Sequence, residues 1–279
     1  MKLLFLGTAQ DAGVPQISCY CKNCMIAREY PSLRRLGPSI ALYDEKKLFC
    51  YLIDASPDLK EQIDLLKVNS PVLFETSNKF PISGVFLTHA HFGHIAGLWS
   101  LGKECIAAQK VKIYCSDKMN NFLMKNHPFQ HLIIQENLDP IIMKTRVKYP
   151  IEDFKIESFT LPHRNEFADT IGYFISHDLK IAYLPDIDYW TEEAIIMIEK
   201  ADIAIIDGTF YSRNEINGIE KVPHPPISES MDLLKSIDTE IYFTHFNHSN
   251  PILRETTVAR KKVDMEGFKI AYDGYILEF

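Results

Sequence analysis

The sequence predicts one α/β domain in which buried strands alternate with amphipathic helices. Eight apolar runs have the length of strands that are buried on both faces. They cover residues 3–6, 48–53, 85–87, 111–114, 171–175, 181–184, 203–206 and 241–243. Between several of these runs, apolar residues recur at helical spacing. These helical stretches are residues 57–68, 117–126, 191–200, 228–237 and 252–265.

Local signals set the boundaries of these elements. A Ser-Pro pair at residues 56–57 precedes the first expected helix and Ser228 begins the fourth, because serine and proline favour helix starts. Residues 68–80 and 210–226 have weak periodicity and turn-forming residues, so we expect loops there. No repeat, low-complexity tract or flexible linker divides the chain, which favours a single domain over residues 1–279.

The composition limits which partners we expect. The formal net charge is −7 and the lysines and arginines are scattered, so we expect no binding to extended nucleic acid or to a membrane. No apolar stretch approaches the roughly 20 residues that span a bilayer, and the apolar opening at residues 1–6 is too short for a signal sequence. We therefore expect a cytoplasmic protein with a small-molecule or short peptide-derived substrate. The sequence leaves open whether the chain is a monomer or a homodimer.

Three histidines follow the apolar run 85–87 within seven residues: His89, His91 and His94. Imidazole is the commonest metal ligand in proteins, and a His-x-His pair at a strand end can aim both side chains into one cavity. Histidine is scarce in this chain, at 10 of 279 residues, so chance is a poor explanation of the cluster. The segment predicts a metal site.

Four further apolar runs end in a residue that commonly binds metals, namely Asp54, His163, Asp186 and His245. Loops at one edge of a sheet converge in space although they are distant in sequence. Alone, His163 could equally be a solvated surface residue, but the shared context favours one site for His163, Asp186 and His245. For Asp54, a turn-forming role is an equal alternative.

Cys19, Cys21 and Cys24 form a C-x-C-x2-C motif. This spacing is too tight for ordinary disulfides and suits one soft metal ion, and the expected location favours reduced thiols. Three thiolates need a fourth donor to complete a tetrahedron. We expect His224, in a proline-rich segment, to complete a structural zinc site, and His248 to be a solvated loop residue or to contact substrate.

These motifs resemble those of the metallo-β-lactamase superfamily, whose five motifs match, in order, Asp54, residues 89–94, His163, Asp186 and His245. The resemblance covers most of the chain and implies a four-layer αβ/βα sandwich. It also implies ligands for two catalytic metals: His89, His91 and His163 on the first, His94 and His245 on the second, and Asp186 between them. In this family Asp54 would be structural and would hydrogen-bond the histidine loop.

The chain departs from the family at Gly93, where the usual motif has an aspartate that binds the second metal. Without that carboxylate we expect a weaker second site, which would favour a mononuclear centre and puts ordinary hydrolysis in doubt. Asp11, in the loop after the first strand, is one candidate replacement, and a turn-forming aspartate is the alternative. Restoring an aspartate at position 93 is expected to strengthen the second site.

A second group of motifs resembles one branch of this family. It comprises Gly7-Thr8, Gly13-Val14-Pro15, the cysteine motif and His224-Pro225-Pro226. That branch includes the pyrroloquinoline quinone biosynthesis protein B and the phosphodiesterase associated with carbon-phosphorus lyase. The resemblance implies a structural zinc apart from the catalytic metals. Asp11 and Gly93 are closer to the quinone-biosynthesis members, because the phosphodiesterase keeps the motif aspartate.

Three functions are compatible with these motifs. The first is a metal-dependent hydrolase of a small phosphodiester or ester, acting through metal-bound hydroxide, with catalytic roles for Asp186, His94, His245 and Asp11. The second is an iron-dependent oxidase or hydroxylase, because three histidines and one carboxylate resemble non-haem iron sites. The third is a non-catalytic metal-binding scaffold. We expect one or two catalytic ions, zinc first and iron or manganese as alternatives, and metal identity would separate the first two functions.

Overall fold

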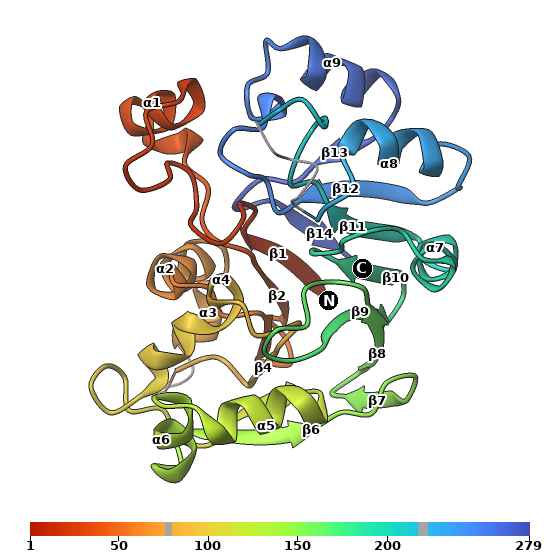
Figure 1. Ribbon diagram of the computed structural model, residues 1–279. Helices are drawn as coiled ribbons and strands as arrows, with labels where there is room; N and C mark the ends of the chain where they lie inside the picture. Colours follow the sequence, from red (N-terminus) through yellow and green to blue (C-terminus); the bar gives the residue numbers. More distant parts are fainter. Residues whose placement is uncertain (76–79, 217–222) are drawn as a thin grey trace.

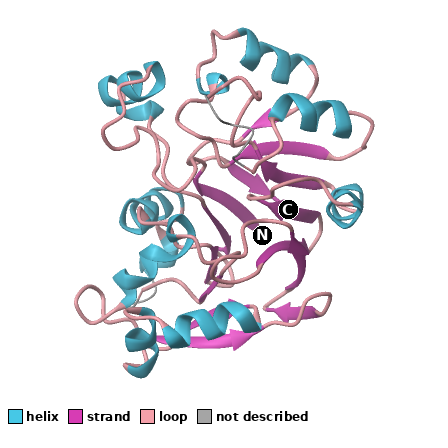
Figure 2. Cartoon of the chain, viewed as in Figure 1, coloured by secondary structure: helices cyan, strands magenta, loops and turns pink. Residues whose placement is uncertain are grey.

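The computed structural model describes residues 1–75, 80–216 and 223–279 (Figure 1). Within this part of the chain, two seven-stranded mixed sheets pack face to face, and helices cover their outer faces (Figure 2). This arrangement confirms the expected α/β four-layer sandwich. Residues 76–79 and 217–222, which belong to the two expected loops, lie outside the described residues.

The first sheet has the strand order β14-β1-β2-β3-β4-β5-β6. β14, β1, β2 and β3 pair antiparallel, and β3 to β6 pair parallel. The pairing of β14 with β1 brings the two ends of the chain together. The strands are β1 (Lys2–Gly7), β2 (Ser39–Asp44), β3 (Phe49–Ile53), β4 (Gly84–Phe86), β5 (Val111–Cys115), β6 (Leu138–Ile142) and β14 (Ile276–Glu278).

The second sheet has the order β13-β12-β11-β10-β9-β8-β7. β7 to β10 pair antiparallel, and β10 to β13 pair parallel. The strands are β7 (Lys148–Ile151), β8 (Phe154–Leu161), β9 (Thr170–Ser176), β10 (Lys180–Leu184), β11 (Ile203–Asp207), β12 (Glu240–Thr244) and β13 (Lys269–Ile270).

The helices flank the sheets, except that α1 projects from the body of the fold (Figure 1). The α-helices are α1 (Lys22–Glu29), α2 (Leu59–Asn69), α3 (Val72–Glu75), α4 (Phe92–Ile95), α5 (Asp117–Lys125), α6 (Phe129–Ile134), α7 (Glu192–Glu199), α8 (Ile227–Leu234) and α9 (Val258–Met265). Short 3-10 helices are η1 (Pro31–Leu33), η2 (Ala96–Leu101) and η4 (Pro251–Leu253).

Alternate side chains of each strand enter different cores. In β1, Leu3 and Phe5 pack between the two sheets, whereas Leu4 and Leu6 pack toward the helices over the first sheet. A third core lies between the second sheet and α7 to α9. Because both faces of the central strands are buried, most of their sequences are continuously apolar, which is why eight strands were recognisable as short apolar runs. β2 was not predicted, although Ile40, Ala41, Leu42 and Tyr43 are buried.

Some elements differ from the sequence prediction. β8 has an alternating pattern, in which Phe154 and Ile156 are buried and Lys155 and Glu157 are not, so it lacks a continuous apolar run. The helix expected over 252–265 is divided into η4 and α9, because the side chain of Thr257 accepts a hydrogen bond from the Arg260 backbone N–H and begins a new helix.

The strand directions determine where the functional loops lie. β1 and β3 each pair antiparallel with β2, so the carboxyl ends of β1, β3 and β4 share one edge of the first sheet. By the same argument, β8, β10, β11 and β12 end at one edge of the second sheet. The loops that follow these strands carry all the ligand-type residues expected at the centre.

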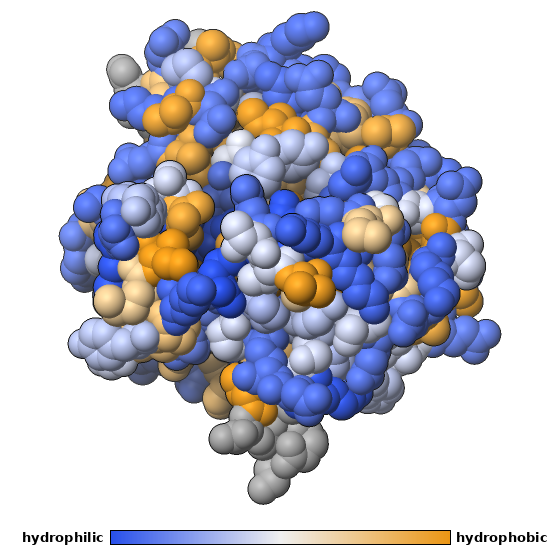
Figure 3. Space-filling view, turned by 90° about the horizontal axis from the view of Figure 1, so that it is seen from above, coloured by the Kyte–Doolittle hydropathy of each residue, from blue (hydrophilic) through white to orange (hydrophobic). Residues whose placement is uncertain are grey.

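No helix in the described ranges is both long and apolar enough to cross a bilayer. The face shown in Figure 3 is mainly hydrophilic, and its hydrophobic residues form small separate groups.

Candidate metal centre

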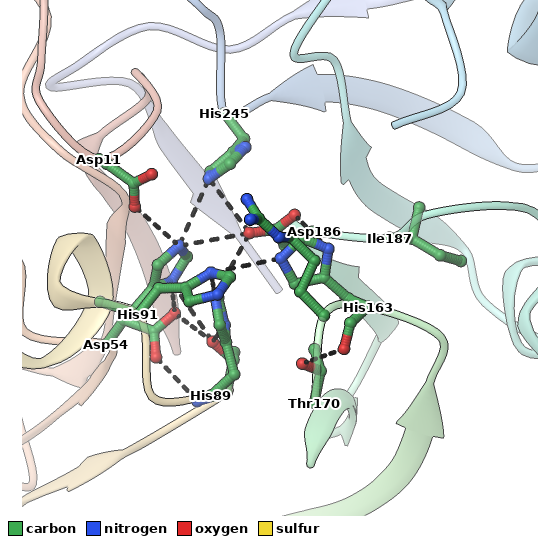
Figure 4. Close-up of polar contacts among 12 residues, drawn as sticks. Asp11, Asp54, His89, His91, His163, Thr170, Asp186, Ile187 and His245 are labelled. Atoms are coloured by element: carbon green, nitrogen blue, oxygen red, sulfur yellow. Dashed lines mark hydrogen bonds and ion pairs between the residues drawn. The ribbon is translucent and has the colours of Figure 1, made fainter. Parts of the chain in front are cut away.

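The loops after β4, β8, β10 and β12 bring histidines around the carboxylate of Asp186 (Figure 4). Except for His91, which is half-buried, the side chains of this group are buried. The group comprises His89, His91, His94, His163, Asp186 and His245. The sequence placed these six residues in one site, and the structure brings them together.

One set of donor atoms belongs to His89, His91, His163 and Asp186. One ligand atom of each lies within 4.8 Å of the other three. His91 Nδ1 is 2.9 Å from His89 Nε2 and 3.3 Å from His163 Nε2. The Oδ2 atom of Asp186 is 3.4 Å from His89 Nε2. Three imidazole nitrogens and one carboxylate oxygen thus converge on one point.

His94 and His245 lie on the other side of the same carboxylate. Asp186 Oδ2 is 3.7 Å from His94 Nε2 and 3.5 Å from His245 Nε2, and these two nitrogens are 3.3 Å apart. Asp186 therefore faces both groups of histidines, as expected of a shared ligand.

Asp54 forms hydrogen bonds that hold the loop carrying His89, His91 and His94. It is fully buried, and its two oxygens accept hydrogen bonds from the backbone N–H and the hydroxyl of Thr88, both at 2.8 Å. Asp54 Oδ2 is also 2.7 Å from His94 Nδ1. The structure confirms the expected hydrogen bonding of Asp54 to this loop, and a turn-forming role alone does not account for it.

The other buried histidines have similar outer partners. The Nδ1 atom of each contacts a polar group outside the set of expected ligands, and Nε2 is directed toward the neighbouring ligands, although His163 Nδ1 also lies 3.3 Å from Asp186 Oδ1. The pairs are His89 with the Thr88 hydroxyl at 3.0 Å, His163 with Asp188 Oδ1 at 2.6 Å, and His245 with the Thr209 hydroxyl at 2.9 Å. Outer partners of this kind orient the ligands of metal sites.

Electrostatics favour neutral imidazoles at most positions of this centre; at His94, burial opposes a charge, but Asp54 and the nearby carboxylates of Asp11 and Asp186 outweigh it and raise the pKa. Burial, reinforced by repulsion from neighbouring histidines, holds the pKa of His89 and His245 well below the usual range and lowers that of His163 to about 2. Burial raises the pKa of Asp186 to about 8. Neutral imidazole is the form that binds a metal ion, and a cation beside Asp186 would offset the cost of burying its charge.

The residues fit a metal ion on a further observation. The Oδ1 atom of Asp186 is buried and has no hydrogen-bond partner among the described residues. A buried carboxylate oxygen without a hydrogen bond is costly. The nearby nitrogens are His163 Nδ1 at 3.3 Å and His224 Nδ1 at 3.4 Å, and each of them has a shorter contact with another carboxylate, that of Asp188 or Asp207. Histidine nitrogens with a carboxylate are donors that zinc and iron accept. The centre is therefore suited to hold metal.

His224 lies in this centre, so its expected role in the cysteine site is wrong. Its Nδ1 is 2.7 Å from Asp207 Oδ2 and 3.4 Å from Asp186 Oδ1. Burial opposes a charge on His224, but the carboxylates of Asp207 and Asp186 outweigh it and raise the pKa of His224 to about 9. Asp207 was not among the expected site residues, although it follows the apolar run 203–206, the same signal that identified Asp54 and Asp186.

His248 takes the place that was expected for His224 beside the cysteines. One ligand atom of His248 and of each of Cys19, Cys21 and Cys24 lies within 4.8 Å of the others. His248 Nδ1 is 3.3 Å from Cys19 Sγ and 3.5 Å from Cys21 Sγ. The prediction that His248 is a solvated residue or a substrate contact did not anticipate this placement.

Local structure explains how the cysteine cluster forms. Cys21 immediately precedes α1 and Cys24 lies in its first turn, so the start of the helix turns both thiols to one side. The Asn23 amide donates hydrogen bonds of 2.8 Å to the backbone carbonyls of His248 and Asn250. This amide joins the cysteine loop to the segment that carries the fourth donor.

Asp11 and a cavity lie between the two clusters. Asp11 Oδ1 is 3.9 Å from His94 Nε2, so the loop after β1 reaches the centre. The cavity has a volume of about 310 Å³. Its walls include Gln10, Asp11, Gln16, Asn247 and His248, with Phe210 and Ile216 as large apolar residues.

Comparisons with known proteins agree with this arrangement. The sequence model of the beta-lactamase superfamily domain matches residues 50–246. Coenzyme PQQ synthesis protein B of Ectopseudomonas mendocina (strain ymp) is 26% identical to this chain over 310 residues, and the match covers 98% of each protein. The protein of the same name from Rhizobium meliloti (strain 1021) is also 26% identical, over 98% of this chain and 96% of the relative.

Solved structures with the same fold include two that match the chain over its whole length. Zn²⁺-bound PqqB from Methylobacterium extorquens superposes with a TM-score of 0.86 at 24% identity, covering 100% of both chains. A diphosphatase from the PhnP family superposes with a TM-score of 0.71 at 25% identity, covering 100% of this chain and 97% of the other.

Proposed function

Since the chain belongs to the metallo-β-lactamase superfamily, we propose that it is a metal-dependent hydrolase of a small phosphodiester or ester. The observation that carries the proposal is the convergence of three imidazole nitrogens and one carboxylate oxygen within 4.8 Å, from His89, His91, His163 and Asp186. Structural similarity to a diphosphatase from the PhnP family supports hydrolysis of a phosphorus-containing substrate.

In this proposal, His89, His91, His163 and Asp186 hold the first ion, and Asp186 also faces a second position beside His94 and His245. A divalent ion in such a centre acidifies water and polarises the oxygen of an ester or phosphodiester. The chain's own contribution is orientation, because Thr88, Asp54, Asp188 and Thr209 hold the outer nitrogens of the histidines.

His224 contributes a fixed polar group next to the reacting region. Asp207 holds its Nδ1, and two backbone N–H groups, those of Ile187 and Thr209, donate to Asp207 at 3.1 and 2.8 Å. The ring is thus set in one orientation beside Asp186. We propose that its other nitrogen, Nε2, hydrogen-bonds a substrate oxygen.

The cavity next to Asp11 supports a small substrate. At about 310 Å³ it lies at the lower end of the volumes typical of small-molecule sites. The amides of Gln10, Gln16 and Asn247 offer both donors and acceptors, while Phe210 and Ile216 supply apolar contact. These walls suit a compact substrate with hydrogen-bonding groups.

We also propose that Cys19, Cys21, Cys24 and His248 hold a structural zinc ion. Three thiolates and one imidazole are a common structural zinc ligand set. Burial raises the pKa of the Cys24 thiol to about 12, so a cation is needed to keep it as a thiolate. The Zn²⁺ in the PqqB structure from Methylobacterium extorquens is consistent with zinc in a fold of this kind.

The proposal is tested by metal content and turnover in the same samples. Metal-free protein is reloaded with Zn²⁺, Mn²⁺ or Fe²⁺ and assayed with bis(p-nitrophenyl) phosphate and p-nitrophenyl acetate. We expect hydrolysis with at least one metal, and we expect His91→Ala to abolish it by removing a ligand of the first ion. His131→Ala, at an exposed position on α6, is the matched control and should retain metal and activity.

Turnover in His91→Ala equal to that of the wild type would contradict the assignment of the centre. Absence of hydrolysis with every metal, across a wider panel of esters and phosphodiesters and in protein that is purified without iron, would instead favour the non-catalytic scaffold. Both results are interpretable only if His91→Ala unfolds at the wild-type temperature, which circular dichroism measures.

A second candidate function is iron-dependent oxidation or hydroxylation of a small or peptide-derived substrate. The observation that favours it is the 26% identity to Coenzyme PQQ synthesis protein B over nearly the whole chain. A centre of three histidines and one carboxylate also suits iron. Iron in the protein as purified, with hydrolysis absent after loading with any metal, would support this function over the first.

A further inference from the structure

Gly93 provides no side chain to complete the group formed by His94 and His245, yet the space next to it is filled. A Cβ atom built on Gly93 would lie 2.5 Å from Asp11 Cα and 2.7 Å from Asp11 Cβ, and it would overlap Asp11 Oδ1. Atoms of a folded protein cannot approach so closely. Asp11 therefore occupies the volume into which a side chain at position 93 would extend.

We infer that the carboxylate ligand of a second metal position has moved from α4 to the loop after β1, so that Asp11 binds a divalent ion together with His94 and His245. One ligand atom of each of these residues lies within 4.8 Å of the other two. The Asp11 carboxylate is turned toward the histidines in Figure 4. The inference rests on the proposed function, because it requires a metal-binding centre.

The two oxygens of Asp11 have different environments. Although 43% of the side-chain surface is exposed, Oδ1 is buried and has no hydrogen-bond partner within the described ranges. A turn-forming aspartate normally uses its oxygen to accept a nearby backbone N–H, which Oδ1 does not do here. An oxygen that is buried, unpartnered and directed at two imidazoles is suited to a cation.

The backbone holds Asp11 and His245 in register with each other. The Gln10 N–H donates to the Phe246 carbonyl at 3.0 Å, and the Phe246 N–H donates to the Thr8 carbonyl at 2.9 Å. These bonds join the residues next to Asp11 and His245 as in a parallel ladder. The two ligands therefore keep their spacing without a metal, which favours a preorganised site.

A tight turn projects the Asp11 side chain from this ladder. The Gly13 N–H donates to the Gln10 carbonyl at 2.8 Å, and Gly13 has a φ of 70°, a conformation that glycine adopts without strain. The chain then pairs with the segment before β2, where Val14 and Arg35 exchange two backbone hydrogen bonds of 2.8 Å. Asp11 thus lies at the tip of a turn that is anchored on both sides.

The test measures how many zinc ions each chain binds. Metal-free protein is dialysed against Zn²⁺, and bound zinc per chain is measured by mass spectrometry. We expect three ions in the wild type, one in the cysteine cluster and two in the centre, and two ions in both Asp11→Ala and Asp11→Asn. Affinity at the second position should fall by more than about 100-fold, because even residues that only orient a ligand affect affinity by about 10–100-fold. Gln10→Ala, on the same loop, is the control and should retain three.

Moving the carboxylate from position 11 to position 93 tests whether Asp11 is a metal ligand or has only a structural role. Gly93→Asp alone should lower stability and zinc content, because its side chain overlaps Asp11; the sequence-based expectation that it strengthens the second site is therefore replaced. The double variant Asp11→Gly/Gly93→Asp relieves the overlap and returns a carboxylate to α4. We expect this double variant to bind three zinc ions again. A folded double variant that binds only two would contradict the inference that Asp11 replaces a carboxylate ligand at position 93.

The remaining outcomes distinguish this inference from the proposed function. A wild-type chain that binds three zinc ions, all retained by Asp11→Ala, would overturn the role of Asp11 alone, as would a wild-type centre with a single ion. Zinc confined to the cysteine cluster would overturn the proposed function as well. If Asp11→Ala fails to fold, the isosteric Asp11→Asn decides the question.

Discussion

The histidine centre and the cysteine cluster draw on two shared segments of the chain but are built differently. The segment after β1 supplies Asp11 to the first and three cysteines to the second. The segment after β12 supplies His245 to the centre and His248 to the cysteines. The centre further collects residues from strand ends in both sheets, whereas the cysteine cluster needs only these two segments.

This difference determines what each cluster depends on. The centre lies at the carboxyl ends of strands from both sheets, and Asp54 and His245 both adopt left-handed backbone conformations, with φ values of 65° and 63°. Such strain persists where the surrounding structure fixes it. The cysteine cluster adjoins α1, whose Ala27 packs only in a small apolar cluster with Ala9 and Val14. The centre is held by the core, whereas the cysteine cluster would be held mainly by the proposed zinc ion.

The largest effect on stability is expected at the base of the centre. Asp54→Ala leaves the Thr88 N–H, the Thr88 hydroxyl and His94 Nδ1 without their buried acceptor. We expect the free energy of unfolding to fall by about 3–5 kcal/mol, as when one member of a buried pair is removed. Urea denaturation of metal-free protein measures this change without a contribution from metal binding.

Asp178→Ala is the control for this prediction, because the Asp178 side chain is 88% exposed. It should change the free energy of unfolding by less than about 0.5 kcal/mol. Equal denaturation midpoints for Asp54→Ala and the wild type would show that the core does not hold the histidine loop through Asp54.

A smaller and more local effect is expected in the cysteine cluster. Cys21→Ser should remove one zinc ion per chain and lower the free energy of unfolding by about 3 kcal/mol, the stabilisation given by a ligand at about 100 times its dissociation constant. Limited proteolysis should then cleave between residues 14 and 35, and mass spectrometry should find the zinc of the centre unchanged.

Cys105→Ser, at an exposed cysteine outside the cluster, should behave as the wild type. Loss of zinc from both clusters in Cys21→Ser would contradict the claim that the centre is held independently of the cysteine cluster. It would mean that the backbone bonds between Thr8, Gln10 and Phe246 do not hold the centre independently of the cysteines.

The smallest effect concerns a carboxyl group that supports the segment after β12. Glu215 accepts a hydrogen bond from the Tyr211 N–H at 2.6 Å and contacts the Ser249 hydroxyl, and burial raises its pKa to about 6. Between the ordinary pKa near 4.5 and about 6, the native chain binds more protons at this group than the unfolded chain does. Stability therefore falls as pH rises through this window, by about 1–2 kcal/mol, and is constant above it.

Glu215→Gln removes this titration, so its free energy of unfolding should vary less than that of the wild type between pH 4.5 and 6.5. Parallel urea titrations of both proteins measure the difference. Identical pH profiles would show that Glu215 is ionised to the same extent in the folded and unfolded chains.

The sequence by itself determined the fold class and the local parts of both sites. Central strands that are buried on both faces have continuous apolar sequences, and eight strands were predicted from such runs. The alternating β8 was missed, and so was β2, although its residues 40–43 form a buried apolar run. His89, His91 and His94 follow one strand, and three cysteines lie within six residues, so their side chains are close whatever the rest of the chain does.

Only the tertiary structure decided which distant residues complete each site. His224 and His248 are chemically alike and both are far from the cysteines in sequence, and spacing along such a separation carries no information about distance in space. Sheet pairing places His248 beside Cys19 and His224 beside Asp207. The same holds for Asp11 and Gly93, which are 82 positions apart, because only the folded backbone brings one carboxylate into the space that the other position leaves empty.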